Sequence, residues 1–174
     1  MDDPSNMQNA LNGLKSNDPE KRRIAAQTLG KLGSPRAIDP LIEALRDRND
    51  AQLRAYAVEA LGKIVERSQS GFSSNGSGES STAEVLSILG KLNQTRLTTP
   101  IQIALRDPDA EVRRCAAIAL GKTGDYHAVN NLGVALQDAD DRVKQAAAEA
   151  LSAIGGDEAV NLLARWWTGT AGSY

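Results

Sequence analysis

A short alanine-rich motif recurs along the chain and constrains its fold more than any other feature. The copies at residues 25–31 and 116–122 read Ala-Ala-x-x-Leu-Gly-Lys, and related copies stand at 57–63, 88–91 and 147–153. Successive copies are 28 to 32 residues apart, and serine replaces the glycine in the last one. Such a period is typical of an array of small repeated units, each packed on the next.

The unit around the first copy predicts two short helices. Asp18 is suited to cap a helix that begins at Pro19, runs to about Leu32 and stops at Gly33. A second helix is expected over residues 37–47, where apolar side chains recur at helical spacing. Two helices joined by a short turn form an antiparallel hairpin. Within the motif, leucine is expected in the core, whereas glycine and lysine are expected to finish the first helix.

Composition agrees with packed helices and narrows the functional classes. Aromatic residues make up only 3% of the 174 residues, which suits close-packed short helices better than a β-sandwich. The net charge of −2 offers no general attraction to a phosphate backbone, so no nucleic-acid partner is expected. A single cysteine, the lack of a signal-peptide pattern and the lack of a long apolar run predict a soluble cytoplasmic protein without a membrane span.

The array is interrupted once. Residues 68–81 are rich in serine and glycine and cannot bury enough apolar surface to order themselves. We interpret residues 1–174 as a single repeat domain with a flexible insertion at about 66–81, because the repeats resume after it. Two arrangements fit the sequence: either residues 65–80 replace the second helix of the interrupted unit, or residues 66–96 are an insertion that carries an extra helix.

The best-preserved unit resembles a known family. Residues 107–122 read Asp-Pro-Asp-x-x-Val-Arg-x-x-Ala-Ala-x-Ala-Leu-Gly-Lys, and residues 40–47 of an earlier unit read Pro-Leu-Ile-x-Ala-Leu-x-Asp. This pattern resembles the HEAT-like repeat of the bilin-lyase type, found in phycobiliprotein lyase subunits and in scaffold proteins, and it covers most of residues 7–168. The resemblance implies an all-α fold, a right-handed α-α superhelix or solenoid of about four to five helical-hairpin repeats.

The resemblance also implies two functions. The first is a non-catalytic protein-binding scaffold or chaperone-like adaptor that uses the concave face of the solenoid, with a phycobiliprotein as its client. The alternative is a subunit of a phycobilin lyase, which holds a linear tetrapyrrole while a cysteine of the client is joined to it. A phycobilin is a cofactor only under this alternative, and no cofactor is expected under the first.

Residues able to carry catalysis or bind a metal are scarce. His127 is the only histidine and Cys115 the only cysteine, so a cluster of His and Cys ligands cannot form within one chain. His127 is expected in an exposed turn. Cys115 shares its repeat position with Ile24 and Tyr56, which predicts a packed, unreactive thiol facing the core; a thiol involved in bilin attachment is the less favoured alternative. We therefore predict no catalytic and no metal-binding residue.

Two columns of charge are expected where the units stack. Each first helix carries a cation at one repeat position and an aspartate four residues earlier, giving Arg22, Arg54, Arg113 and Lys144 beside Asp18, Asp50, Asp109 and Asp140. The structural interpretation is that the aspartates cap helices and the cations link neighbouring units. The alternative is an anion-binding site, which the adjacent acids disfavour.

The second helices differ from one another where they are expected to line the concave, partner-binding face. Ile103 and Val134 stand at the position that Glu43 holds in the first unit. They predict an exposed hydrophobic strip flanked by Ala104 and Ala135, unless these helices are rotated so that the strip packs inside. The residues predicted to bind a partner are Glu43, Ile103, Arg106, Val134, Gln137, Arg165 and Trp166.

Trp166 and Trp167 form the densest aromatic feature of the chain. By repeat register, Trp167 matches Leu105 and Leu136 and is expected in the core, whereas Trp166 matches Ala135, nearer to the concave edge. Trp166 is therefore expected either to cap the open end of the array or to anchor a partner.

Overall fold

The computed structural model describes residues 4–72 and 98–171, and within these ranges the chain forms helices and no strands. Four long first helices carry the motif or its variant: α2 (Pro19–Leu32), α4 (Ala51–Phe72), α6 (Ala110–Thr123) and α8 (Asp141–Ile154). The second helices are α3 (Ile38–Ala44), residues 98–104, α7 (Val129–Ala135) and α9 (Asp157–Ala171), and 3-10 turns η1 (Pro35–Ala37) and η2 (Tyr126–Ala128) lead into α3 and α7. The prediction of an all-α fold is confirmed.

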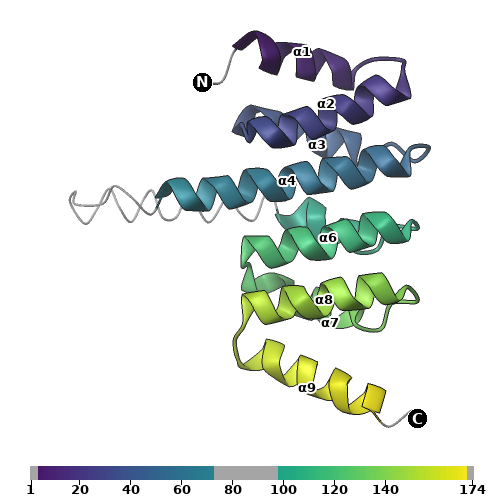
Figure 1. Cartoon of the computed structure of the whole chain (residues 1–174), viewed down its shortest axis with the longest axis vertical. Helices are drawn as coiled ribbons and strands as arrows, with labels where there is room; N and C mark the ends of the chain where they lie inside the picture. The colour runs from purple at the N-terminus through teal and green to yellow at the C-terminus, as the bar shows by residue number, and fades with distance from the viewer. Residues whose placement is uncertain (1–3, 73–97, 172–174) are drawn as a thin grey trace, which may run out of the picture.

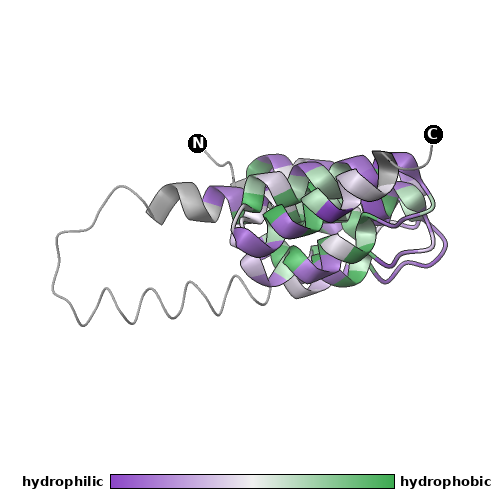
Figure 2. Cartoon of the chain, turned by 90° about the horizontal axis from the view of Figure 1, so that it is seen from below, coloured by the Kyte–Doolittle hydropathy of each residue, from purple (hydrophilic) through white to green (hydrophobic). Residues whose placement is uncertain are grey.

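The helices form two layers (Figure 1). In the first layer α2 packs on α4, α4 on α6, and α6 on α8. Behind it, α3 packs on α4 and α7 on α8, so a second helix ties its own unit to the next one. The N-terminal helix α1 (Pro4–Leu14) covers the outer side of α2. Seen along the stack, apolar residues gather between the layers and polar residues face outward (Figure 2). The result is a solenoid of four helical hairpins preceded by one helix.

The ends of the first helices follow the predicted signals. The Asp18 carboxylate accepts a hydrogen bond from the backbone N–H two residues later at 3.0 Å, and Asp109 and Asp140 do the same at 2.9 Å. Gly33 and Gly124 close α2 and α6 in the left-handed conformation, with φ of 66° and 62°, which glycine adopts without a Cβ penalty. The capping residues of the repeat were therefore predicted correctly.

The motif leucine lies in the core as predicted, but the motif glycine has another role than finishing a helix. Leu29 and Leu120 are fully buried. Gly121 lies inside α6, which continues to Thr123, and a Cβ atom on it would stand 2.8 Å from the Cα of Ala150 in α8. Equivalent contacts at Gly30 and Gly62 would be 2.9 Å and 2.8 Å from the nearest atom. The glycine is thus required because neighbouring first helices touch there.

The position of the insertion is resolved by the packing of the first helices. Because α4 and α6 pack directly on each other, no other first helix separates them, and residues 98–104 form the second helix of the α4 unit. This agrees with an insertion at residues 66–96 and not with replacement of the second helix by residues 65–80. Residues 66–72 continue α4; the rest of the predicted insertion, with its expected extra helix, lies outside the described residues.

Candidate partner-binding site

The predicted hydrophobic strip lies on the outer side of two consecutive second helices. Ile103 and Val134 expose 68% and 69% of their surface, in residues 98–104 and in α7 respectively. Rotation that would pack this strip inside is therefore excluded. Ala104 and Ala135, expected to flank it, are instead buried; on each helix they follow the exposed residue by about 100° and so face the first layer.

The polar residues predicted at this face are also exposed, but they differ in whether another side chain forms an ion pair with them. Glu43 is engaged by Arg46, whose Nη1 lies 2.9 Å from its carboxylate. Arg106 and Gln137 follow the exposed ends of their helices. Between residues 98 and 171, and in 4–72, no carboxylate forms an ion pair with Arg106, so its guanidinium is available to an acidic group of a partner.

A groove of about 480 Å³ runs beside the strip. Its apolar wall includes Leu45, Pro100 and Ile103, and its polar lining includes Arg106 and Asn131. It lies where the end of α3, residues 98–104 and α7 come together, so three units contribute to it. Nothing in the local sequence pattern indicated this groove, because its walls come from segments more than 50 residues apart.

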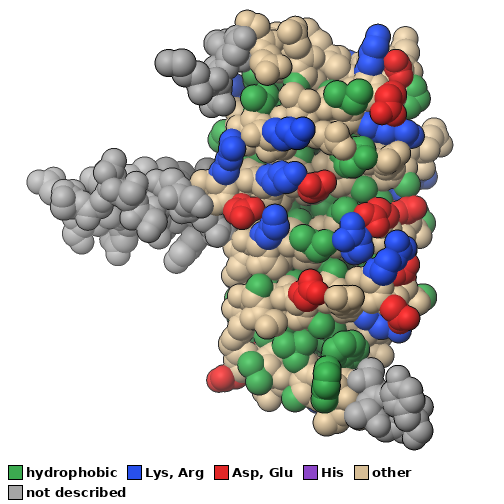
Figure 3. All heavy atoms as spheres, in the orientation of Figure 1, with side chains coloured by type: hydrophobic (Ala, Val, Ile, Leu, Met, Phe, Trp, Pro, Cys, Tyr) green, Lys and Arg blue, Asp and Glu red, His purple; other side chains and the backbone are tan. Residues whose placement is uncertain are grey.

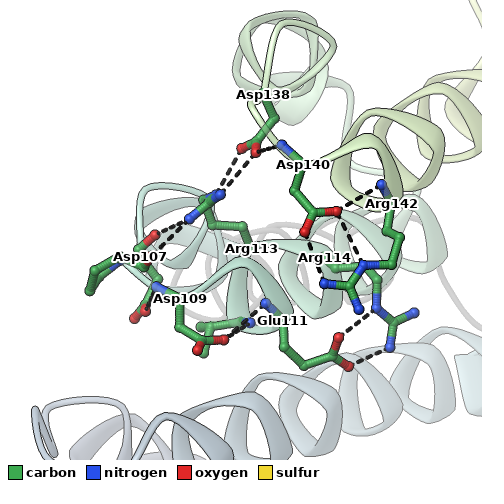
Figure 4. Close-up of polar contacts among 10 residues, drawn as sticks. Asp107, Asp109, Glu111, Arg113, Arg114, Asp138, Asp140 and Arg142 are labelled. Carbon is green, nitrogen blue, oxygen red and sulfur yellow. Dashed lines mark hydrogen bonds and ion pairs between the residues drawn. The ribbon is translucent and has the colours of Figure 1, made fainter.

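The cation column is a structural ladder and not an anion site. Arg113 donates to both oxygens of Asp138 at 2.7 and 2.9 Å and to the backbone carbonyl of Asp107 at 2.8 Å (Figure 4). Arg54 repeats this arrangement with Asp107, at 2.8 Å to each oxygen. These guanidinium groups are largely buried and fully used, so they cannot also hold a ligand.

The acids in this ladder stand at another repeat position than Asp109 and its equivalents. Arg54 and Arg113 each bond to the aspartate that follows the second helix of their own hairpin, and each also donates to a backbone carbonyl at the end of the preceding hairpin. Asp109 caps a helix, as predicted. On the first-helix face, positive and negative side chains are interspersed (Figure 3). The Arg113 hydrogen bonds hold the pKa of the Asp138 carboxyl below its usual range, as expected for a carboxylate bound by two N–H donors.

Neither His127 nor Cys115 lies in surroundings that would favour catalysis. His127 lies exposed in η2, with Nδ1 2.9 Å from a carboxylate oxygen of Asp125. Cys115 is half-buried: it packs against the core, as predicted, and it also lines a groove with Tyr56 and Ile118. Ile24, at the same repeat position, is exposed. Burial raises the pKa of the Cys115 thiol to about 11, so this thiol is protonated and weakly nucleophilic near neutral pH.

Within the described residues, 4–72 and 98–171, no three His, Cys, Asp or Glu side chains come together in a way that could hold a metal ion. None of the helices in the same ranges combines the length and the apolarity needed to cross a membrane.

The two tryptophans exchange the places predicted for them. Trp166 is partly buried against the core, whereas Trp167 is 70% exposed, and their rings meet edge to face with centroids 6.5 Å apart. The repeat register was correct, because Trp167 does follow Leu136 by one period. Leu136 is buried because α8 packs on α7, so the exposure of Trp167 at the same repeat position shows that register alone does not determine burial.

These features define the class of protein: an α-solenoid that presents an apolar strip on its second helices. The family model described as HEAT repeats matches residues 1–72 and 97–173, and the chain belongs to this family. The unmatched residues coincide with the inserted segment.

Comparison with known structures agrees with this fold. Two crystal structures of engineered proteins from the Northeast Structural Genomics Consortium are similar to the chain, at 22% and 21% identity and with TM-scores of 0.59 and 0.61. The alignments cover 92% and 96% of this chain and 68% and 70% of those proteins. A search of curated proteins found no significant match. At these identities the likeness concerns the fold alone.

Proposed function

We propose that this protein is a non-catalytic scaffold or chaperone-like adaptor, which binds a partner protein through the exposed face of its second helices, the face that is concave in solenoids of this kind. The observation that carries the proposal is the pair Ile103 and Val134, two large apolar side chains exposed at the same repeat position on consecutive units. Contiguous exposed apolar surface is typical of a partner-binding site. We further propose a cytoplasmic location, consistent with a single cysteine held as a thiol.

The groove beside the strip suggests the chemistry of the partner. An apolar side chain could enter between Leu45 and Ile103, while an acidic group pairs with Arg106 at the groove's polar side. Gln137 and Arg165 extend the polar rim along the same face, where they favour orientation more than affinity. A partner segment that combines apolar and acidic residues fits this arrangement.

Replacing Ile103 and Val134 together with aspartate is expected to weaken partner binding at least tenfold, because two buried apolar contacts would become charged and poorly solvated. Binding can be measured by quantitative pull-down followed by titration with the captured partner. Ile24→Asp is the matched control, since Ile24 is also exposed but lies on the first-helix face. Unchanged binding by a correctly folded double variant would exclude the strip as the binding site.

The resemblance to bilin-lyase repeats supports a phycobiliprotein as the client, and it supports a second candidate function, a phycobilin lyase subunit. The observation that favours this second function is the groove itself, whose volume is in the range of small-molecule sites and whose exposed Arg106 could pair with a propionate of a linear tetrapyrrole. The high pKa of Cys115 agrees with attachment to a thiol of the client.

Mixing the purified protein with phycocyanobilin tests the lyase candidate. If the groove holds the pigment, its visible spectrum is expected to change on binding, and Arg106→Ala is expected to reduce that change severalfold. The Arg165→Ala variant is the matched control, because Arg165 lies on the same face but does not line the groove. A spectrum that stays unchanged, with and without an added partner subunit, would leave the adaptor function alone.

A further inference from the structure

The motif lysine, which the proposed function does not use, forms a row of positive charge on the first-helix face. Lys31, Lys63 and Lys122 hold the same repeat position in α2, α4 and α6, and these helices pack one on the next. We call the three residues the lysine row. It ends at α6, because Ala153 stands at this position in α8. Lys and Arg side chains gather over the C-terminal halves of α2, α4 and α6 in the space-filling view (Figure 3).

A role in finishing a helix does not account for all three lysines. A cation in the last turn of a helix interacts favourably with the exposed carbonyl groups there, and Lys31 and Lys122 lie in such turns. Lys63, however, lies more than two turns before the end of its helix, because α4 continues to Phe72. What the three lysines share is the face of the solenoid that they occupy.

Cations outnumber acids around the lysine row, although charges of both signs lie on the first-helix face as a whole. Residues 26–32, 59–67 and 117–123 carry four cations and two acids, which are Lys31, Lys63, Arg67 and Lys122, and Glu59 and Glu66. The excess of positive charge is therefore local to the C-terminal halves of α2, α4 and α6.

The lysines of the row are available to an acidic partner. Lys63 pairs with Glu59 at 2.6 Å, and Lys122 pairs with Glu66 at 3.4 Å. Both pairs are exposed to solvent, where an ion pair contributes little to stability, so a carboxylate of a partner can take the place of either acid. Among residues 4–72 and 98–171, no carboxylate lies within ion-pair distance of Lys31.

Two grooves lie beside the lysine row, and Tyr56 lines both of them. One groove, of about 180 Å³, lies between α2 and α4 and is also lined by Lys31 and Lys63. The other, of about 300 Å³, lies between α4 and α6 and is also lined by Ile118 and Lys122. The row thus combines cationic groups with space for uncharged rings or apolar side chains.

We propose that the lysine row binds an acidic, proline-rich segment of a partner protein, which lies in the polyproline II conformation across α2, α4 and α6. Packed helices lie about 8–10 Å apart, and this is the expected separation of lysines on neighbouring first helices. A polyproline II segment advances about 9 Å in each turn of three residues. An acid at every third position therefore faces one lysine after another, where each carboxylate accepts a charge-assisted hydrogen bond.

The grooves suit the residues between the acids. Polyproline II segments bind grooves that are lined by aromatic side chains, and the Tyr56 ring lies between two such grooves. Proline rings keep the segment extended before it binds, which reduces the entropy lost when it is ordered. An anionic lipid surface, in contrast, would contact the lysines but place nothing in the grooves.

Fluorescence anisotropy with the full chain and a synthetic peptide of Glu-Pro-Pro repeats tests this proposal. Binding is expected at low ionic strength and is expected to weaken as salt is added. A peptide of the same composition with all its glutamates adjacent is expected to bind severalfold more weakly, because its charges do not match the spacing of the row. Lys31→Gln combined with Lys63→Gln and Lys122→Gln is expected to raise the dissociation constant at least tenfold.

Lys15→Gln combined with Lys21→Gln and Lys144→Gln is the matched control, since it removes the same charge outside the row and is expected to leave binding nearly unchanged. Circular dichroism verifies that both triple variants fold. The variant with Ile103→Asp and Val134→Asp is also expected to bind the peptide normally, which separates this proposal from the proposed function. No binding by the wild-type protein, equal affinity for the two peptides, equal losses in the two triple variants, or binding of anionic lipid vesicles in place of the peptide would each overturn the proposal.

Discussion

Replacing Gly121 with valine is expected to lower the free energy of unfolding by about 3 kcal/mol or more. A Cβ atom at this position would stand 2.8 Å from the Cα of Ala150, so backbone and not a flexible side chain would have to move. The strain outweighs the helix propensity of valine, which exceeds that of glycine by only about 0.4 kcal/mol. Urea denaturation followed by circular dichroism measures the effect.

Ser152→Val is the matched control for this prediction. Ser152 holds the same repeat position in α8, but it is exposed. The same substituent is therefore expected to change stability little. Equal losses at both positions would show that the contact between α6 and α8 is not what requires glycine at residue 121.

Replacing Arg113 with methionine is expected to be the second most damaging change, with a loss of about 3 kcal/mol at neutral pH. The substitution keeps much of the side chain's apolar length but leaves the Asp138 carboxylate, which is largely buried, without its two guanidinium donors. It also removes the hydrogen bond to the carbonyl of Asp107. Arg142→Met is the control, since Arg142 also bonds to an aspartate, Asp140, but is mostly solvent-exposed, and it is expected to cost far less.

The effect of Arg113→Met should depend on pH in a defined direction. Arg113 holds the pKa of Asp138 lower in the folded protein than in the unfolded chain. Its contribution to stability is therefore complete above the unfolded-state pKa of about 4 and is lost as the pH falls through the folded-state value. Denaturation curves from about pH 6 to about pH 2 should show the two proteins converging at low pH. A stability difference that stays constant over this range would contradict the assigned role of Asp138.

Features that depend on nearby residues were predicted correctly from the sequence. Asp18, Asp109 and Gly33 were correctly assigned as helix caps, because a cap acts on backbone groups within a few residues of itself. Leu29 was correctly placed in the core by its periodicity. The exposure of Ile103 and Val134 was predicted from repeat register, but burial of their neighbours Ala104 and Ala135 depends on how each short helix is turned against the first layer.

Contacts between residues on different helices were predicted less well, because they depend on how the helices pack. The partner of Arg113 could be chosen only once Asp138, 25 residues away, was placed beside it. Cys115 was expected to face the core; it does pack against the core, but it also borders a groove between α4 and α6. Both relations depend on how separate helices pack against each other, which the spacing along one helix does not show.

The sequence by itself determined the number and kind of units, their caps and their core leucines, because these features depend on a period of about 31 residues and on local hydrogen bonds. Only the tertiary structure decided why the motif glycine is needed, which aspartate each ladder arginine binds, and that Trp167 is exposed while Trp166 is packed. Each of these is set by how helices pack against one another, within a hairpin or between neighbouring units. The sequence of a repeat determines the fold of its own helices, whereas the packing of the repeats determines which side chains are exposed.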